Sequence, residues 1–223
     1  MYKILHKNRF TIFFGTQLAI LFGSLIFHTT LFTEKIVPVL FLINIASGLL
    51  MISHRKILTW FYTALFVLSL VFFGIDLINE SGIGPNLTKR FFVYFLFYAS
   101  VTYGIIHLVW KSKKVNTKVM IGLISGYISI GFMAFFLFST LEIYNPDSFV
   151  GQLFTPEFTI ADRLDALLYF SYITILTIGY GDIVPATPMA QKAVVLVSLT
   201  GQFYTLIVTA VVLEKYIRHS KKK

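Results

Sequence analysis

The sequence contains no cysteine, so the chain can form no disulfide and has no thiolate ligand for a metal. Charged residues are also scarce: they make up 13% of the 223 residues, whereas a soluble domain carries roughly 25%. In their place, 57% of the residues are hydrophobic and 17% are aromatic. Apolar runs of roughly 20 residues, the length that crosses a bilayer, recur along the chain. The composition therefore excludes an ordinary soluble domain and predicts an integral membrane protein.

Hydropathy predicts an all-α membrane protein with six transmembrane helices. Lys3, Lys7 and Arg9 precede the first apolar run, as in a signal peptide, but that run is too long for one and lacks a small-x-small exit. We therefore expect a retained helix there. The six predicted spans are 10–32, 37–53, 58–78, 91–110, 119–143 and 190–217.

The basic residues predict the orientation of these spans, because cytoplasmic loops of membrane proteins are rich in Lys and Arg. With the amino terminus inside, the cytoplasmic side holds most of the 19 basic residues and only one acid, Glu214. The outer side keeps Lys35, Lys89, Arg90, Arg163 and Lys192. We expect a multi-pass protein of the cell membrane with both termini in the cytoplasm. This distribution also accounts for the net charge of +9, so no nucleic-acid partner is expected.

The segment between the last two spans has a different pattern. It opens with the polar turn Asn145-Pro146-Asp147, and then continues into an apolar helix from Ile160 to about residue 176, which is short for a full crossing. Thr159, followed three residues later by Asp162, predicts a capped start of this helix. Glycine-rich backbone follows at membrane depth, where lipid allows it only beside protein or a wet cavity. The pattern predicts a re-entrant pore helix and loop entering from the outer face.

Residues 177–182 of this loop read Thr-Ile-Gly-Tyr-Gly-Asp. Gly179 and Gly181 permit a positive φ, which lets successive backbone carbonyls turn toward one axis. Rings of such carbonyls from four chains can replace the hydration shell of K⁺. We expect K⁺ to bind at Thr177, Ile178, Gly179, Tyr180 and Gly181, with the Thr177 hydroxyl adding an oxygen at the inner end. Tyr180 is expected to brace the loop against surrounding helices, and Asp182 to concentrate cations at the outer mouth.

Residues 177–182 are preceded by Tyr169-Phe170-Ser171-Tyr172 and followed by Ile183-Val184-Pro185. The whole segment resembles the filter signature of the tetrameric potassium channel family. The resemblance implies a homotetramer with two pore-lining helices per subunit, no cofactor beyond K⁺ as the permeant ion, and no enzymatic activity. It also implies a hinge at Gly201 in the last span. Two positions depart from the family pattern: Leu176 stands where a second Thr is frequent, and Ile173 where an acid or Val is frequent.

Polar residues follow Gly201 at helical spacing. Gln202, Thr205 and Thr209 lie on one stripe of the last span, and Leu213 and Ile217 continue it inward. Polar groups facing lipid are costly, so we assign the stripe to a water-filled cavity.

The chain divides into residues 1–112 and the pore domain 113–223. The first part resembles the four-helix voltage sensor of the six-helix branch of the family, but its fourth span has no charged residue between Arg90 and Lys111. Steep voltage gating needs several charges there, so we expect weak or absent voltage gating by this bundle. Within this bundle, Gln17 and Asn44 are expected to hydrogen-bond between helices.

Three further possibilities stay open at this stage. Lys111, Lys113 and Lys114 could bind anionic lipid or only anchor the topology. A ligand sensor, where one exists, would be a separate cytoplasmic subunit or would lie within the membrane. The rival functions are a nonselective cation channel and a regulatory subunit that co-assembles with another potassium channel.

Overall fold

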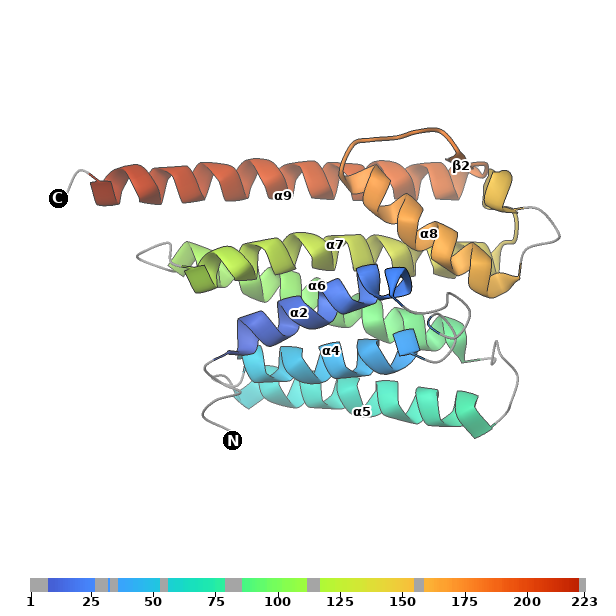
Figure 1. Cartoon of the computed structure of the whole chain (residues 1–223), viewed down its shortest axis with the longest axis horizontal. Helices are drawn as coiled ribbons and strands as arrows, with labels where there is room; N and C mark the ends of the chain where they lie inside the picture. Colours follow the sequence, from blue (N-terminus) through green and yellow to red (C-terminus); the bar gives the residue numbers. More distant parts are fainter. Residues whose placement is uncertain are drawn as a thin grey trace.

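The structure is a computed structural model that describes residues 8–26, 32, 36–52, 56–78, 86–111, 117–154 and 159–220. Within these residues, the fold is a helical bundle with the tilted helix α8 (Ile160–Ile175) and a two-stranded sheet at one end (Figure 1). The predicted boundary at 112/113 falls outside the described residues, so the division into two domains stays a prediction.

The elements are α2 (Arg9–Phe22), the 3₁₀ turn η1 (Gly23–Leu25), α4 (Val37–Ile52), α5 (Lys56–Ile78), α6 (Leu87–Lys111), α7 (Thr117–Tyr144), β1 (Phe149–Gly151), η3 (Gln152–Phe154), α8 (Ile160–Ile175), β2 (Ile183–Pro185) and α9 (Pro188–Ser220). The helices α4 to α7 and α9 overlap the predicted spans, with ends that differ by a few residues. Several helices extend a few residues beyond the predicted apolar runs, because polar residues at their ends continue the helical backbone. The first predicted span, 10–32, differs more: α2 ends at Phe22 and a 3₁₀ turn follows, while residues 27–31 lie outside the described part of the chain.

Two of these helices are long and apolar enough to cross a membrane. They contain the stretches Val119–Tyr144 in α7 and Pro188–Lys215 in α9. Shorter apolar stretches occur at Arg9–Leu25, Val37–Gly48 and Trp60–Ile75. The all-helical membrane architecture is thus supported, while the count of six spans stays a prediction.

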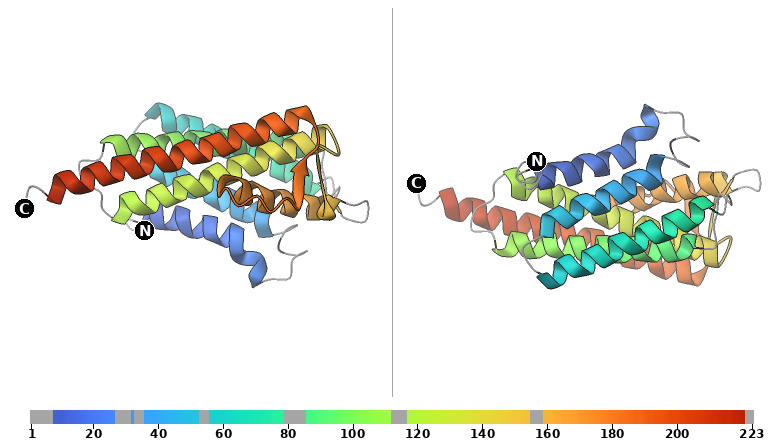
Figure 2. Two further views of the ribbon diagram at one scale, coloured as in Figure 1. Left: turned by 90° about the horizontal axis from the view of Figure 1, so that it is seen from above. Right: turned by 90° about the horizontal axis from the view of Figure 1, so that it is seen from below.

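The long helices run along a common direction and alternate up and down (Figures 1 and 2). As a result, the first residues of α2 and the last residues of α9 lie at the same end of the bundle. The sheet and the start of α8 lie at the opposite end. The tilted α8 covers only the part of the bundle nearest that end, as a half-length helix should.

Aromatic side chains join α4 and α6 to α7. The ring of Phe41 lies 5.3 Å from that of Phe132 and 5.6 Å from that of Tyr94, and Tyr98 lies 5.1 Å from Phe132. Lipid is as apolar as these side chains, so close packing and hydrogen bonds, rather than the hydrophobic effect, hold such helices together. The first helices are therefore packed directly on α7 of the same chain.

Polar side chains add hydrogen bonds within this packing. Asn44 donates to the Thr16 hydroxyl at 2.6 Å and accepts from the Tyr98 hydroxyl at 2.6 Å. Gln17 donates to the Ser129 hydroxyl at 2.9 Å, which links α2 to α7. The prediction that Gln17 and Asn44 are interhelical partners is confirmed.

Tyrosine hydroxyls connect α7 to the helices on its other side. Tyr172 of α8 donates to the carbonyl of Ile128, and Tyr204 of α9 donates to the carbonyl of Leu123, at 2.8 and 2.7 Å. Glycines on α7 make room for these rings: a Cβ at Gly131 would lie 2.3 Å from Tyr172. The position of α8 against α7 therefore depends on the glycine at position 131.

Gly131→Ala is expected to destabilise the protein by about 1–3 kcal/mol, because the added methyl must displace Tyr172 and weaken its bond to Ile128. Gly15→Ala is the matched control, since a Cβ at Gly15 meets nothing within 4 Å. The control should keep or slightly raise stability, as alanine favours helix. The comparison is made on the thermal unfolding midpoints of the purified proteins. Equal midpoints for the two variants would contradict this packing role.

Candidate functional site

The start of α8 is fixed by a capping box. The Thr159 hydroxyl accepts from the backbone N–H of Asp162 at 3.2 Å, and the Asp162 carboxylate accepts from the N–H of Thr159 at 2.9 Å. Both groups satisfy backbone donors that the helix itself leaves without acceptors. The predicted cap and the predicted helix from Ile160 are confirmed, and α8 ends at Ile175.

The end of α8 is held by hydrogen bonds to its last turn. The N–H of Thr177 donates to the carbonyl of Thr174 at 3.1 Å, and that of Ile178 to Ile173 at 2.9 Å. From the other side, the Tyr127 hydroxyl of α7 donates to the carbonyl of Ile175 at 2.9 Å. These contacts set the point at which the chain leaves the helix and enters the loop.

The backbone of the loop alternates in handedness. Thr177, Gly179 and Gly181 have φ of 58°, 59° and 80°, whereas the intervening Ile178 and Tyr180 keep the usual negative φ. Alternating signs of φ at successive residues allow successive peptide groups to turn the same way, which a row of carbonyls facing one axis requires. The positive φ expected at Gly179 and Gly181 is confirmed.

Of the three residues with positive φ, Thr177 has the least favourable backbone conformation. A β-branched residue rarely adopts a positive φ, and a left-handed conformation costs roughly 1–2 kcal/mol. Residues 177–182 are also exposed in the single chain, with Tyr180 at 71%. The helices of this chain therefore do not provide the expected brace for Tyr180, and that role stays a prediction.

Asp182 ends the loop and is held by the side chain of α8. The Tyr169 hydroxyl donates to the Asp182 carboxylate at 2.8 Å. The loop is thus connected to α8 at its exit as well as at its entrance.

A small sheet, which the sequence did not predict, anchors the exit strand. β1 pairs antiparallel with β2, in a register that sets Val150 opposite Val184. A side chain at Gly151 would collide with the carbonyl oxygen of Asp182, so this position needs glycine. Beyond β2, the Thr187 hydroxyl accepts from the N–H of Ala190 and caps α9, and Pro188 occupies the first helical position.

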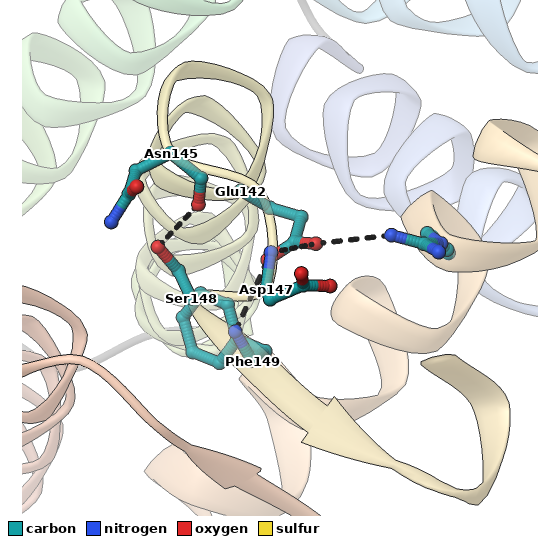
Figure 3. A network of polar contacts seen from close by, with 6 residues as sticks. Glu142, Asn145, Asp147, Ser148 and Phe149 are labelled. Carbon is teal, nitrogen blue, oxygen red and sulfur yellow. Dashed lines mark hydrogen bonds and ion pairs between the residues drawn. The ribbon is translucent and has the colours of Figure 1, made fainter. Parts of the chain in front are cut away.

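Glu142, in the last turn of α7, organises the other side of this sheet (Figure 3). Its carboxylate is 7% exposed and accepts from the backbone N–H groups of Asp147 at 3.2 Å and Phe149 at 3.1 Å. Arg163 of α8 pairs with the same carboxylate at 3.4 Å. One side chain therefore connects α7, the strand β1 and the start of α8, and the sequence analysis did not single it out.

The predicted stripe on α9 lies on an exposed face. Gln202, Thr205 and Thr209 are exposed in the single chain, as is Leu213, whereas the side chain of Ile217 lies outside the described residues. Gly201 is buried against Ile175: a Cβ there would lie 3.2 Å from the side chain and 3.4 Å from the carbonyl oxygen of Ile175. α9 runs unbroken through Gly201, so the structure gives this glycine a packing reason, and the hinge stays a prediction.

Other predicted residues lie outside this site or outside the described residues. The side chains of Lys111, Lys113 and Lys114 belong to the second group, so their lipid contacts stay a prediction. Among the described residues, no group of three His, Cys, Asp or Glu side chains could hold a metal ion. The oxygen atoms that residues 177–182 offer are the backbone carbonyls, the hydroxyls of Thr177 and Tyr180, and the carboxylate of Asp182.

Comparison with known proteins agrees with this geometry for part of the chain. Residues 142–218, about a third of the sequence, match a family model described as "Ion channel". The match begins at Glu142 and includes α8, the loop, β2 and most of α9. No curated protein and no solved structure matches the chain. The site thus belongs to a segment similar to an ion channel domain in a membrane protein.

Glu142→Gln is expected to destabilise the protein by about 2 kcal/mol. The amide loses the charge that pairs with Arg163 and replaces one of the two oxygens that accept from backbone N–H groups. Asp147→Asn is the matched control, because Asp147 is exposed in the same turn and asparagine tolerates its φ of 63°.

Chemical denaturation or thermal unfolding of both variants measures this difference. Limited proteolysis after residue 144 adds a local readout, and it should become faster only in Glu142→Gln. A Glu142→Gln protein as stable as Asp147→Asn would show that the three contacts of Glu142 contribute little.

Proposed function

We propose that this chain is one subunit of a homotetrameric, potassium-selective channel in which residues 177–182 form the ion filter. The observation that carries the proposal is the alternating backbone at Thr177, Gly179 and Gly181. Such a backbone allows carbonyl oxygens to face one exposed side of the loop, where they can replace the water around K⁺. The match of residues 142–218 to an ion channel model supports the coarser part of the proposal.

The need for four copies follows from the single loop in each chain. One row of carbonyls covers one side of an ion, whereas a ring around the ion requires several rows. The helix α9 supports this assembly, because only 17% of its spanning stretch is buried, compared with 72% for α7. Its free face mixes Leu199, Phe203 and Leu206 with Gln202 and Thr205. Apolar residues of this kind can pack on a neighbouring copy, while the polar ones face a central, wet cavity.

The orientation in the membrane follows from the same arrangement. The filter exit, β1 and β2 lie at the end of the bundle opposite the first residues of α2 and the last residues of α9 (Figure 1). With the basic residues of both termini in the cytoplasm, the filter opens to the outside and K⁺ enters the cavity from the inside. Six spans per subunit fit this arrangement.

Potassium flux tests the proposal directly. Purified protein in liposomes is expected to pass K⁺ far faster than Na⁺ without any added subunit. Gly181→Ala should lower K⁺ flux by tenfold or more, because alanine is strained at φ 80° although a Cβ there meets nothing within 4 Å. Gly74→Ala is the control glycine, since it also meets nothing but lies within α5.

Each alternative function gives a different result in this assay. Equal K⁺ and Na⁺ flux would indicate a nonselective cation channel. No flux from folded protein would favour a regulatory subunit that needs another channel. Unchanged flux in Gly181→Ala would show that the loop is not the filter.

Voltage should act weakly on this channel. Moving one charge through 100 mV yields about 2.3 kcal/mol, and residues 91–110 of α6 offer no charge to move. Conductance is therefore expected to change only slightly between strongly negative and strongly positive potentials, as measured on single channels in planar bilayers. A conductance curve as steep as that of an arginine-rich sensor would contradict this expectation.

A further inference from the structure

A cavity of about 310 Å³ lies between the first helices of the chain and α8. It sits where the end of α2 and the starts of α4, α6 and α8 come together, at the same end of the bundle as the sheet (Figure 1). Its wall also includes Phe135 of α7. The cavity is thus distinct from the proposed filter, which lies on the opposite side of α8 along the exposed face of α9.

The wall of this cavity is mostly apolar. Phe41, Phe91 and Phe135 are all less than 9% exposed, and Leu21 and Leu164 complete the wall from α2 and α8. A volume of this size lies at the lower end of the range for ligand-binding cavities, and apolar walls are typical of them. In a membrane protein, the hydrocarbon chains of lipids are the apolar molecules present at the highest concentration around such an opening. The walls therefore fit a single acyl chain.

Two opposite charges line the same cavity. Arg90 comes from the first turn of α6 and Asp165 from the second turn of α8. The other polar side chains of the wall are those of Ser24, Tyr94 and Thr159, each of which carries a hydroxyl. A guanidinium binds phosphate strongly, and a carboxylate binds an ammonium that can donate hydrogen bonds. Together the two charges complement a headgroup that carries both a phosphate and a primary amine.

We propose that this cavity binds one phospholipid with a zwitterionic headgroup of the phosphatidylethanolamine type. Its acyl chain occupies the apolar cavity, its phosphate pairs with Arg90, and its ammonium pairs with Asp165. A purely anionic headgroup would leave Asp165 facing a like charge, and a quaternary ammonium would have no hydrogen to donate. The lipid site requires that the chain lies in a membrane, but it does not require ion conduction. The lipid proposal and the proposed function can therefore fail independently of each other.

The experiment measures lipid binding to the purified full-length chain. After removal of native lipid in detergent, native mass spectrometry counts bound phospholipids per subunit. Phosphatidylethanolamine, phosphatidylcholine and phosphatidylglycerol with identical acyl chains are titrated separately. The proposal predicts one saturable site per subunit, with the ethanolamine lipid bound most tightly.

Three variants change the cavity. Arg90→Gln should weaken binding of the ethanolamine lipid about fivefold or more. Leu21→Phe, which fills the cavity, should weaken all three lipids. Asp165→Asn should remove the preference for ethanolamine over glycerol. The matched controls are Lys89→Gln, Leu68→Phe and Asp147→Asn, because these three residues are exposed and lie outside the cavity wall.

The outcomes separate the proposal from its alternatives. The lipid proposal would be overturned if no saturable site is found, as when a neighbouring subunit covers the cavity. It would also be overturned if phosphatidylglycerol binds more tightly than phosphatidylethanolamine. If Leu21→Phe and Arg90→Gln bind lipid as tightly as the control variants do, the lipid binds at another surface. If Arg90→Gln fails to fold, Leu21→Phe and the headgroup series still decide the question.

Discussion

Gly179, Tyr180 and Gly181 make no backbone–backbone hydrogen bond with other described residues. At the membrane depth that we propose for this loop, no bulk water replaces such bonds. Unpaired peptide groups cost several kcal/mol each in hydrocarbon, so they persist only beside protein or a wet pathway. An ion that accepts carbonyl oxygens as ligands satisfies the acceptors. The rest of the structure can be understood as the support that keeps this stretch of backbone in place.

That support acts at both ends of the loop. At the entrance, α8 is fixed by its capping box and by the tyrosine contacts with α7. At the exit, Tyr169 holds Asp182, and the β1–β2 pair joins the strand to the turn that Glu142 organises. The strained φ of Thr177 lies between these two anchors. Because carboxylate, hydroxyl and backbone groups are all paired, the anchors remain stable without disulfides or metals.

Much of this arrangement could be predicted from the sequence because its signals are local. The helix from Ile160 and its cap depend on residues three apart, and the positive φ of Gly179 and Gly181 depends on the glycines themselves. The β1–β2 pair could not be predicted, since two three-residue strands separated by all of α8 have no periodicity to detect. Glu142 could not be recognised either, because in the sequence it is a single acid in the last apolar turn of a helix, and its partners lie 5, 7 and 21 residues further along the chain. The brace for Tyr180 and the hinge at Gly201 involve neighbouring copies or motion, which one chain does not contain.

The central claim is that the loop selects K⁺ through its backbone carbonyls, and the reversal potential of single channels tests it most directly. The protein is reconstituted alone in a planar bilayer with a tenfold K⁺ gradient opposed by an equal and opposite Na⁺ gradient. The account predicts a reversal potential close to the K⁺ equilibrium value of about 59 mV, because a tenfold ratio corresponds to about 1.4 kcal/mol for one charge. A reversal potential near zero would show that the pore does not distinguish the two ions, and would contradict the account.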